Sequence, residues 1–183
     1  MPTRQLGDGM QMTDAESMLG IRRRRWPAEA CVFHRELAAA MLAHEAAGPG
    51  LVVSNVGGWH SAPDVLTWPE PAVELLIARL RSVVAEWAGE DRDWQLWATA
   101  LRRGGYHVAH RHGDAEWAGV YYVAAGEAGQ GGAITFARGV TSCTIAPEEG
   151  MLLMFPGALL HSVAEYRGAT PRMSVGFNLA RTA

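Results

Sequence analysis

Three histidines in this chain could bind a metal ion together. His110 and His112 are separated by one residue, and His161 follows much later in the chain. Side chains alternate between the two faces of a β-strand, so two histidines at this spacing project to the same face. Neutral imidazole is a ligand for iron, zinc, copper and nickel. Two adjacent ligands and a third from a distant strand leave positions open for water, oxygen or substrate, so we predict a catalytic metal site.

A second group of residues predicts a site for an anion. Residues 172–179 alternate in polarity, with Arg172, Ser174, Gly176 and Asn178 on one face and Met173, Val175, Phe177 and Leu179 on the other. A guanidinium on an inward face is costly to bury without a partner. Arginine can bind both oxygens of a carboxylate, and a serine adds one more donor. We therefore expect a carboxylate-binding pocket beside the metal, with a structural ion pair from Arg172 to Asp114 or Glu116 as the alternative.

The remaining histidines and the nearby acids are interpreted as ordinary residues. His107 stands at an odd offset from His110 and is expected to face away from the metal. Asp114 and Glu116 are expected to be solvated loop charges, although either carboxylate could take the place of a histidine ligand. Isolated histidines are more often hydrogen-bonded core or surface residues than ligands, and we interpret His34, His44 and His60 in this way.

Hydrophobic periodicity indicates the elements that must position these residues. Helices are expected at about 27–47 and 71–88. The arginines at 22–25 are expected in a solvated helix start or loop, and residues 54–61 in a loop after a short strand at 51–53. Later strands are expected at 94–102, 106–110, 119–123, 133–136, 141–145, 151–155 and 173–179. Strands in series without helices between them predict an all-β core with N-terminal helices, folded as an antiparallel sandwich or jelly roll.

Length and composition restrict the class of protein. A chain of 183 residues fits one domain, which we place at 22–183 behind a flexible leader at 1–21. The net charge of −3 argues against a nucleic-acid-binding surface. We expect no membrane contact, because no stretch approaches about 18 unbroken apolar residues and the N-terminus lacks a signal-peptide pattern. Cys31 and Cys143 are expected to be reduced, which is typical of a cytoplasmic protein. The N-terminal helices could support a homodimer.

Together, these motifs resemble those of a known family. The resemblance is carried by Tyr106, His110 and His112, by the segments 131–136, 155–156 and 160–163, and by Arg172, Ser174, Phe177 and Asn178. This order resembles the Fe(II)/2-oxoglutarate-dependent oxygenases. The most similar branch has H-x-H where most members have H-x-D. Segments 54–61 and 117–123 are also similar to that branch, so the resemblance extends from about Leu51 to the C-terminus.

The resemblance implies a cupin-like double-stranded β-helix that binds Fe(II) through His110, His112 and His161. It also implies that Arg172 and Ser174 bind the far carboxylate of 2-oxoglutarate, that Tyr106 lines that pocket, and that no residue beyond the metal ligands is catalytic. The implied reaction consumes O2 and couples decarboxylation of 2-oxoglutarate to oxidation of a C–H bond. We expect hydroxylation of a small molecule, such as an amino acid or a biosynthetic intermediate. Contacts to that substrate are expected from Asn55, Trp59, Arg103, His107 and Trp117.

Two other interpretations stay open at this point. Gly104, His110, His112 and Glu116, followed by Gly150, Pro156 and His161, are also similar to the two motifs of the cupins, with Glu116 as a fourth ligand. A cupin-type metal enzyme would use no 2-oxoglutarate and would leave Arg172 and Ser174 without a role. The second alternative is a module that binds a metal or a small ligand and performs no reaction.

Overall fold

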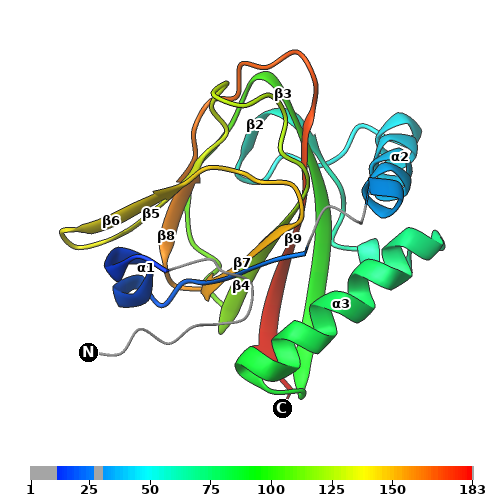
Figure 1. Ribbon diagram of the computed structural model, residues 1–183. Coiled ribbons are helices and arrows are strands. Elements are labelled where there is room, and N and C mark those ends of the chain that lie inside the picture. Colours follow the sequence, from blue (N-terminus) through cyan, green and yellow to red (C-terminus); the bar gives the residue numbers. More distant parts are fainter. Residues whose placement is uncertain (1–11, 27–30, 183) are drawn as a thin grey trace.

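The computed structural model describes residues 12–26 and 31–182, and it shows a strongly curled sheet with helices packed on its outer side (Figure 1). Nine strands of the described residues form one antiparallel sheet in the order β1-β7-β4-β9-β3-β8-β5-β6, with β2 paired to β3. The strands are β1 (Arg22–Arg25), β2 (Asn55–His60), β3 (Arg92–His110), β4 (Trp117–Ala124), β5 (Ile134–Arg138), β6 (Thr141–Ile145), β7 (Met151–Pro156), β8 (Leu160–Val163) and β9 (Arg172–Arg181). The expected all-β core with N-terminal helices, rolled as a jelly roll, is confirmed.

Strand β3 is the longest strand of the described residues and pairs with β2, β8 and β9. It is one continuous strand where the sequence predicts two, and its first half pairs with β9 from Arg92↔Arg181 to Leu101↔Arg172. Its far end pairs with β8 at His110↔His161. Gly105 lies between the two halves, and a Cβ there would collide with the backbone oxygen of Gly57 on β2. Glycine therefore lets β2 and β3 approach closely at this point.

The helices are α1 (Asp14–Leu19), α2 (Cys31–Ala47), the short 3-10 helix η2 (Val65–Thr67) and α3 (Pro71–Ala88). Helix α3 has the predicted bounds, because Pro71 suits the first turn and Gly89, with φ of 87°, follows the last. For the first predicted helix, α2 confirms the part from residue 31; residues 27–30 lie outside the described residues. Within the described chain, no helix combines the length and hydropathy that a membrane crossing requires.

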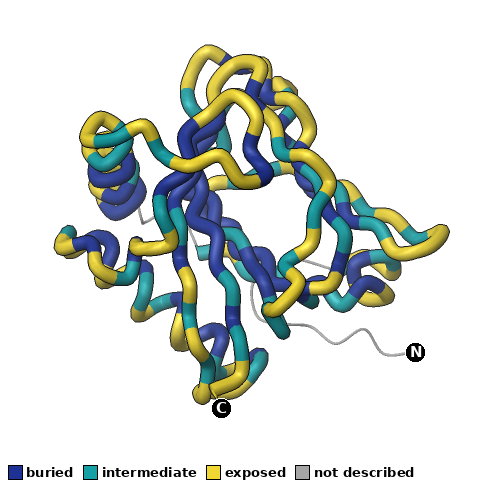
Figure 2. The backbone as a smooth tube through the Cα atoms, turned by 180° about the vertical axis from the view of Figure 1, so that it is seen from behind, coloured by how far each residue is buried: buried dark blue, intermediate teal, exposed yellow. Residues whose placement is uncertain are grey.

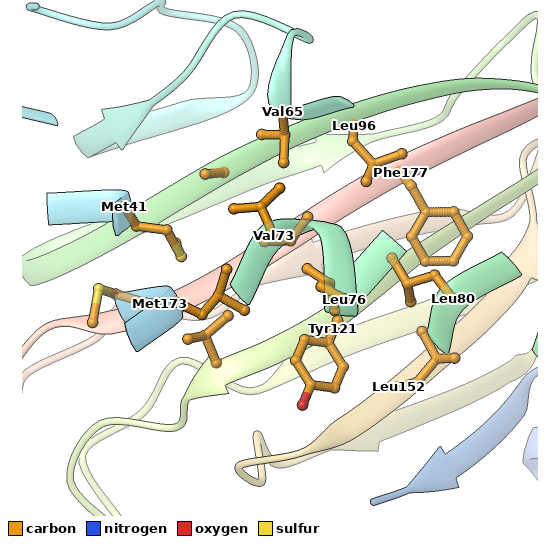
Figure 3. Close-up of a cluster of buried hydrophobic side chains, with 14 of the residues drawn as sticks. Met41, Val65, Val73, Leu76, Leu80, Leu96, Tyr121, Leu152, Met173 and Phe177 are labelled. Carbon is orange, nitrogen blue, oxygen red and sulfur yellow. The ribbon is translucent and has the colours of Figure 1, made fainter. Parts of the chain in front are cut away.

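The larger core lies between the helices and the outer face of the roll. In Figure 3, Leu80 of α3 lies beside Phe177 of β9, and Leu76 lies beside Tyr121 of β4. Fully burying such aliphatic side chains stabilises the fold by about 1.5–3 kcal/mol each. A second cluster, which includes Tyr122, Phe136 and Phe155, lies on the inner side. The central strands are accordingly buried, and the exposed residues gather in loops and outer elements (Figure 2).

Three segments differ from the sequence-based expectation. The arginines at 22–25 form edge strand β1, which pairs with β7, instead of a helix start or loop. Three of them form ion pairs, Arg23 with Glu16, Arg24 with Glu86 and Arg25 with Glu148. Charged side chains are a usual feature of an edge strand. Residues 55–60, expected in a loop, form β2, whereas 51–53 form no strand.

The expected leader at 1–21 divides into two parts. Residues 1–11 lie outside the described residues. Residues 14–19 form α1, which begins with a capping box between Thr13 and Glu16. Leu19 and Ile21 are buried in the inner cluster, so this part of the expected leader is packed into the fold.

Candidate metal centre and cofactor pocket

The three predicted metal ligands lie together. His110 ends β3, His112 follows in the next loop, and His161 lies on β8 directly across from His110. One ring nitrogen from each histidine lies within 4.8 Å of the other two. The Nε2 atoms of His112 and His161 are 3.3 Å apart. The three nitrogens could hold a metal ion and leave positions open for further ligands, with His110 on β3, His112 in the loop that follows and His161 on β8.

Backbone contacts orient two of these rings. The Nδ1 atom of His110 is 2.8 Å from the carbonyl oxygen of Val108, and Nδ1 of His161 is 2.9 Å from that of Leu159. A carbonyl accepts only from a protonated nitrogen, so these contacts place the proton on Nδ1 and leave the Nε2 lone pair free. Metal-binding histidines are commonly oriented in this way.

The environment of the cluster favours neutral imidazole. Burial, with repulsion from the neighbouring histidines, lowers the pKa of His112 to about 3. Burial also lowers the pKa of His161 to about 4, although its hydrogen bond to Leu159 acts in the opposite direction. Because a metal binds neutral imidazole, these pKa values keep the nitrogens available at neutral pH.

Arg172 lies in the same cavity with no acid beside it. Its side chain is 2 % exposed, and no carboxylate of the described residues lies within ion-pair distance. Its Nε is buried without a hydrogen-bond partner, and its guanidinium lies over the ring of Tyr122, 4.9 Å from the centroid. Gly132 packs directly against this side chain, because a Cβ there would lie 2.7 Å from Cδ of Arg172. An uncompensated buried guanidinium is costly, and a carboxylate ligand would offset that cost.

Ser174 and Tyr122 complete the surroundings of Arg172. The Ser174 hydroxyl is 2.9 Å from that of Thr99 on β3 and lines the same cavity. The Tyr122 side chain is buried beside Arg172, and burial raises the pKa of this phenol although the Arg172 guanidinium acts in the opposite direction. Tyr122 was not predicted as a site residue. Its position at an even offset from Val120 on β4 is the signal that could have identified it, since both side chains line the cavity.

The histidines and Arg172 open into one cavity of about 540 Å³, a size typical of small-molecule sites. Its walls are mainly apolar and aromatic, with Trp97 stacked between His60 and His112. The inward face predicted for β9 is confirmed: Arg172, Ser174, Gly176 and Asn178 all line the cavity. His60, which we interpreted as an ordinary residue, also lines it.

Of the five predicted substrate contacts, the structure places only His107 in the cavity wall, where its Nδ1 lies 3.1 Å from the Ser54 hydroxyl. The Asn55 side chain instead stabilises the backbone around the start of β2. It accepts a hydrogen bond from the Val53 N–H and donates to the carbonyls of Leu51 and Gly58. Three of the other predicted contacts lie outside the cavity lining: Trp59 in the helix-side core, Trp117 beside Arg22, and Arg103 at the surface. Tyr106, predicted for the cofactor pocket, is 37 % exposed and also lies outside the lining.

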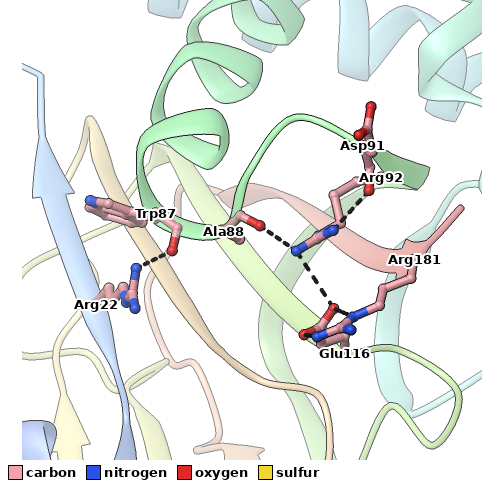
Figure 4. A network of polar contacts seen from close by, with 7 residues as sticks. All are labelled: Arg22, Trp87, Ala88, Asp91, Arg92, Glu116 and Arg181. Atoms are coloured by element: carbon pink, nitrogen blue, oxygen red, sulfur yellow. Dashed lines mark hydrogen bonds and ion pairs between the residues drawn. The ribbon is translucent and has the colours of Figure 1, made fainter.

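The acidic residues near the metal cluster are occupied elsewhere or point away. Glu116 forms two hydrogen bonds of 2.9 Å with Arg181 and lies 3.7 Å from Arg92 (Figure 4). The hydrogen bonds with Arg181 lower the pKa of the Glu116 carboxyl. Asp114 is exposed and outside the cavity lining. The ion pair that we considered between Arg172 and Asp114 or Glu116 is therefore not formed, and Glu116 does not join the histidine cluster.

Comparison with known proteins agrees with this geometry. Residues 95–178 match the model of a family described as putative 2OG-Fe(II) oxygenase. The matched segment contains the three histidines, Arg172 and Ser174. The match confirms the resemblance to the Fe(II)/2-oxoglutarate-dependent oxygenases, and with it Fe(II) and 2-oxoglutarate as the cofactors of the family. None of the curated proteins matches the chain.

Solved structures share the fold at low sequence identity. A Pseudomonas putida prolyl-4-hydroxylase superposes with a TM-score of 0.72 at 17% identity, covering 93% of this chain and 97% of that one. The viral collagen prolyl hydroxylase of Paramecium Bursaria Chlorella virus-1, solved with 2OG, gives 0.66 at 13% identity over 88% and 96%. The epimerase SnoN from nogalamycin biosynthesis gives 0.70 at 12% identity over 91% and 80%. These similarities confirm the double-stranded β-helix.

Proposed function

We propose that this protein is an Fe(II)/2-oxoglutarate-dependent oxygenase. It couples oxidative decarboxylation of 2-oxoglutarate to oxidation of a C–H bond in a small molecule, such as an amino acid or a biosynthetic intermediate. The observation that carries the proposal is a buried arginine without an acid partner, in the same cavity as three convergent histidines.

The residues fit both cofactors. His110, His112 and His161 supply three imidazole nitrogens, and imidazole is a suitable ligand for Fe(II). Arg172 and Ser174 supply donors for the far carboxylate of 2-oxoglutarate, and Tyr122 offers a further hydroxyl beside Arg172 in the same cavity. Iron and 2-oxoglutarate together supply the oxidising chemistry when they are bound.

The chain itself positions the reactants and excludes water. Arg172 orients the acid through a guanidinium that buried neighbours hold in place, and Val108 and Leu159 fix the rings of two ligands. The apolar walls around the histidines limit the water that can reach the metal. No described residue besides the metal ligands is needed to transfer a proton, so we assign no separate acid or base.

Hydroxylation is the reaction that we propose. Similar folds belong to prolyl hydroxylases, and also to SnoN, an epimerase, and SnoK, a carbocyclase, both from nogalamycin biosynthesis. All of these reactions can begin by removal of hydrogen from carbon, and the viral hydroxylase, SnoN and SnoK are each described with 2-oxoglutarate (alpha ketoglutarate). We favour a free small molecule, because aromatic and apolar side chains surround the cavity on several sides.

The cupin alternative has less support than the oxygenase. It assigns Glu116 as a fourth ligand, yet this carboxylate is bound by Arg181 and lies outside the histidine cluster. It also gives the buried Arg172 no function. A binding module without turnover would have the same cavity. It would be distinguished from the oxygenase by forming no succinate in the experiment below.

The proposed function is tested by incubating the purified protein with Fe(II), ascorbate and 2-oxoglutarate in air and measuring succinate. We expect slow decarboxylation of 2-oxoglutarate even without the second substrate. Succinate above the level of a metal-free control therefore supports the proposal. Isothermal titration of 2-oxoglutarate into protein loaded with Mn(II) provides a reading that needs no turnover. Absence of both succinate and metal-dependent 2-oxoglutarate binding would refute the oxygenase and leave the cupin or the binding module.

A further inference from the structure

We propose that the cavity selects an organic anion with an apolar body, and that Arg111 at the cavity mouth contributes to this selection. The inference rests on the proposed function, because it concerns the substrate of the same site. It follows from the charges that line the cavity, from the composition of the metal-ligand set and from the apolar rim of the opening.

Among the described residues, the cavity lining contains two arginines, Arg111 and Arg172, and no aspartate or glutamate. The two acids that follow in the sequence, Asp114 and Glu116, lie outside the lining, and Glu116 is paired with Arg181. A cationic substrate would therefore meet only like charge and neutral imidazole. An anionic substrate would meet a positive potential that apolar walls strengthen, because they exclude water.

The ligand set adds to this imbalance. The far carboxylate of 2-oxoglutarate would pair with Arg172, which leaves one carboxylate against the two charges of Fe(II), since the three histidines are neutral ligands. The loaded site would therefore carry a net charge of about +1, which an acidic metal ligand would have cancelled. A carboxylate or similar group on the substrate restores neutrality in a site where an unbalanced charge is costly.

Arg111 is placed to meet the substrate at the opening. It lies between the ligands His110 and His112, is exposed, and still lines the cavity. No ion pair or hydrogen bond of the described residues engages its guanidinium. A guanidinium at this position can approach an anion in the cavity and also attract it from solution.

The rim of the opening is apolar and preformed. Leu51, Val53 and Val108 line the mouth, although they are 46%, 66% and 46% exposed. The Asn55 side chain fixes the backbone of the first two through its bonds with Val53 and Leu51. Exposed apolar side chains held in place beside a cavity favour a ligand with an apolar portion.

Three probes that share one ring system test the inference: 2-naphthoate, 2-naphthamide and 2-naphthylmethylamine. Each is titrated calorimetrically into protein loaded with Mn(II) and 2-oxoglutarate, and also into metal-free protein. We expect the anion to bind at least about tenfold more tightly than the cation, with the neutral amide between them, because like charges in a desolvated site repel strongly. Equal or tighter binding of the amine would overturn the inference, and binding of none of the three would refute the apolar body.

A matched pair of variants tests the role of Arg111. Arg111→Gln should weaken 2-naphthoate binding about two- to fivefold, the range for an exposed ionic contact, and leave the amide unchanged. Arg103→Gln removes an equally exposed arginine of β3 that does not line the cavity, and it should change neither affinity. Equal effects of the two variants would refute the role of Arg111. The affinities of the three probes can be ranked even in a protein that forms no succinate, because binding needs no turnover. Failure of the oxygenase proposal is therefore distinguishable from failure of the proposed anion selectivity.

Discussion

His110 and His161 face each other across the β3–β8 pair, with ring centroids 4.2 Å apart. The two strands are joined here by sheet hydrogen bonds, so the separation of the rings is set by backbone pairing. His112 reaches the same point from the loop that follows β3. The proposed metal site is thus assembled by the pairing of two strands that are distant in sequence.

Substitution of His161 should abolish stoichiometric metal binding. His161→Ala removes one of the three candidate ligand nitrogens, the one that β8 supplies. We expect the variant to retain less than about a tenth of the metal. Loss of a residue that merely hydrogen-bonds to a metal ligand typically lowers metal affinity about 10- to 100-fold, and loss of the ligand itself should lower it at least as much. Metal content after loading with Fe(II) or Mn(II) and desalting provides the measurement. His44→Ala, which removes a histidine outside the cavity, should bind as the unmodified protein does; full occupancy in His161→Ala would contradict the assignment.

Substitution of Arg172 should separate cofactor binding from metal binding. Arg172→Leu is expected to weaken 2-oxoglutarate binding about a hundredfold, because it removes the cation that pairs with a buried carboxylate. Metal content should be nearly unchanged. Arg172→Lys keeps the charge but loses the planar fork, so an intermediate affinity is expected. Titration of 2-oxoglutarate into Mn(II)-loaded variants measures this, and unchanged affinity in the leucine variant would eliminate Arg172 as the anchor.

A pair of glycines tests the shape of the cofactor pocket without removing a charge. Gly132 has φ of 72°, and a Cβ there would press on Arg172; Gly129 has φ of 76°, with nothing near the added atom. Both alanine variants carry similar backbone strain, about 1–2 kcal/mol. Only Gly132→Ala should weaken 2-oxoglutarate binding, by displacing the guanidinium. Comparable affinities in both variants would show that this packing contact does not position Arg172.

Stability of the metal-free protein should fall as the pH decreases below about 6.5. The folded-state pKa values of about 3 for His112 and about 4 for His161 lie below that of an unfolded histidine. The unfolded chain therefore binds more protons in this interval, and each such histidine lowers the free energy of unfolding by up to about 1.4 kcal/mol per pH unit. Urea denaturation at pH 7.0, 6.0 and 5.0 measures the slope. His112→Gln should show a smaller slope, and a stability independent of pH in both proteins would be inconsistent with buried neutral rings.

Helix α3 offers a prediction that concerns stability alone. Leu76 is fully buried in the helix-side core, whereas its neighbour Leu75 is 43 % exposed. Leu76→Ala should reduce the free energy of unfolding by about 2–5 kcal/mol through lost burial and a residual cavity. Leu75→Ala should change it by less than about 0.5 kcal/mol. Denaturant midpoints of the two variants test this, and similar midpoints would show that α3 does not pack on the roll as described.

The parts of the fold with strong periodicity were predictable from the sequence. The apolar stripe of α3 gave its bounds, and the alternation of residues 172–179 gave the inward face of β9. The arginine strand β1 and the glycine-rich strand β2 were missed, because partner strands rather than local preference determine their conformation.

The site was predictable where residues able to bind a metal or an anion occur at the spacing of one strand face, as for the histidines and Arg172. Substrate contacts were not, because large or polar residues near a motif in sequence need not face the cavity. Asn55 and Trp59 illustrate this: one holds a loop and the other packs in the core. For Tyr122, alternation along β4 shows which residues share its face, but which face lines the cavity is decided by the closure of the sheet, and the same holds for Trp97 on β3.

The place of β9 in the sheet has a consequence for how the molecule is made. It is the last strand of the described chain, yet it lies between β4 and β3 in the middle of the sheet. Strands β3 and β4 can pair with β2, β8 and β7 without it, but they are joined to each other only through β9. Pairing between segments distant in sequence is slow, so we expect the joining of these two parts of the sheet, which also brings Arg172 to the histidines, to be a late step of folding.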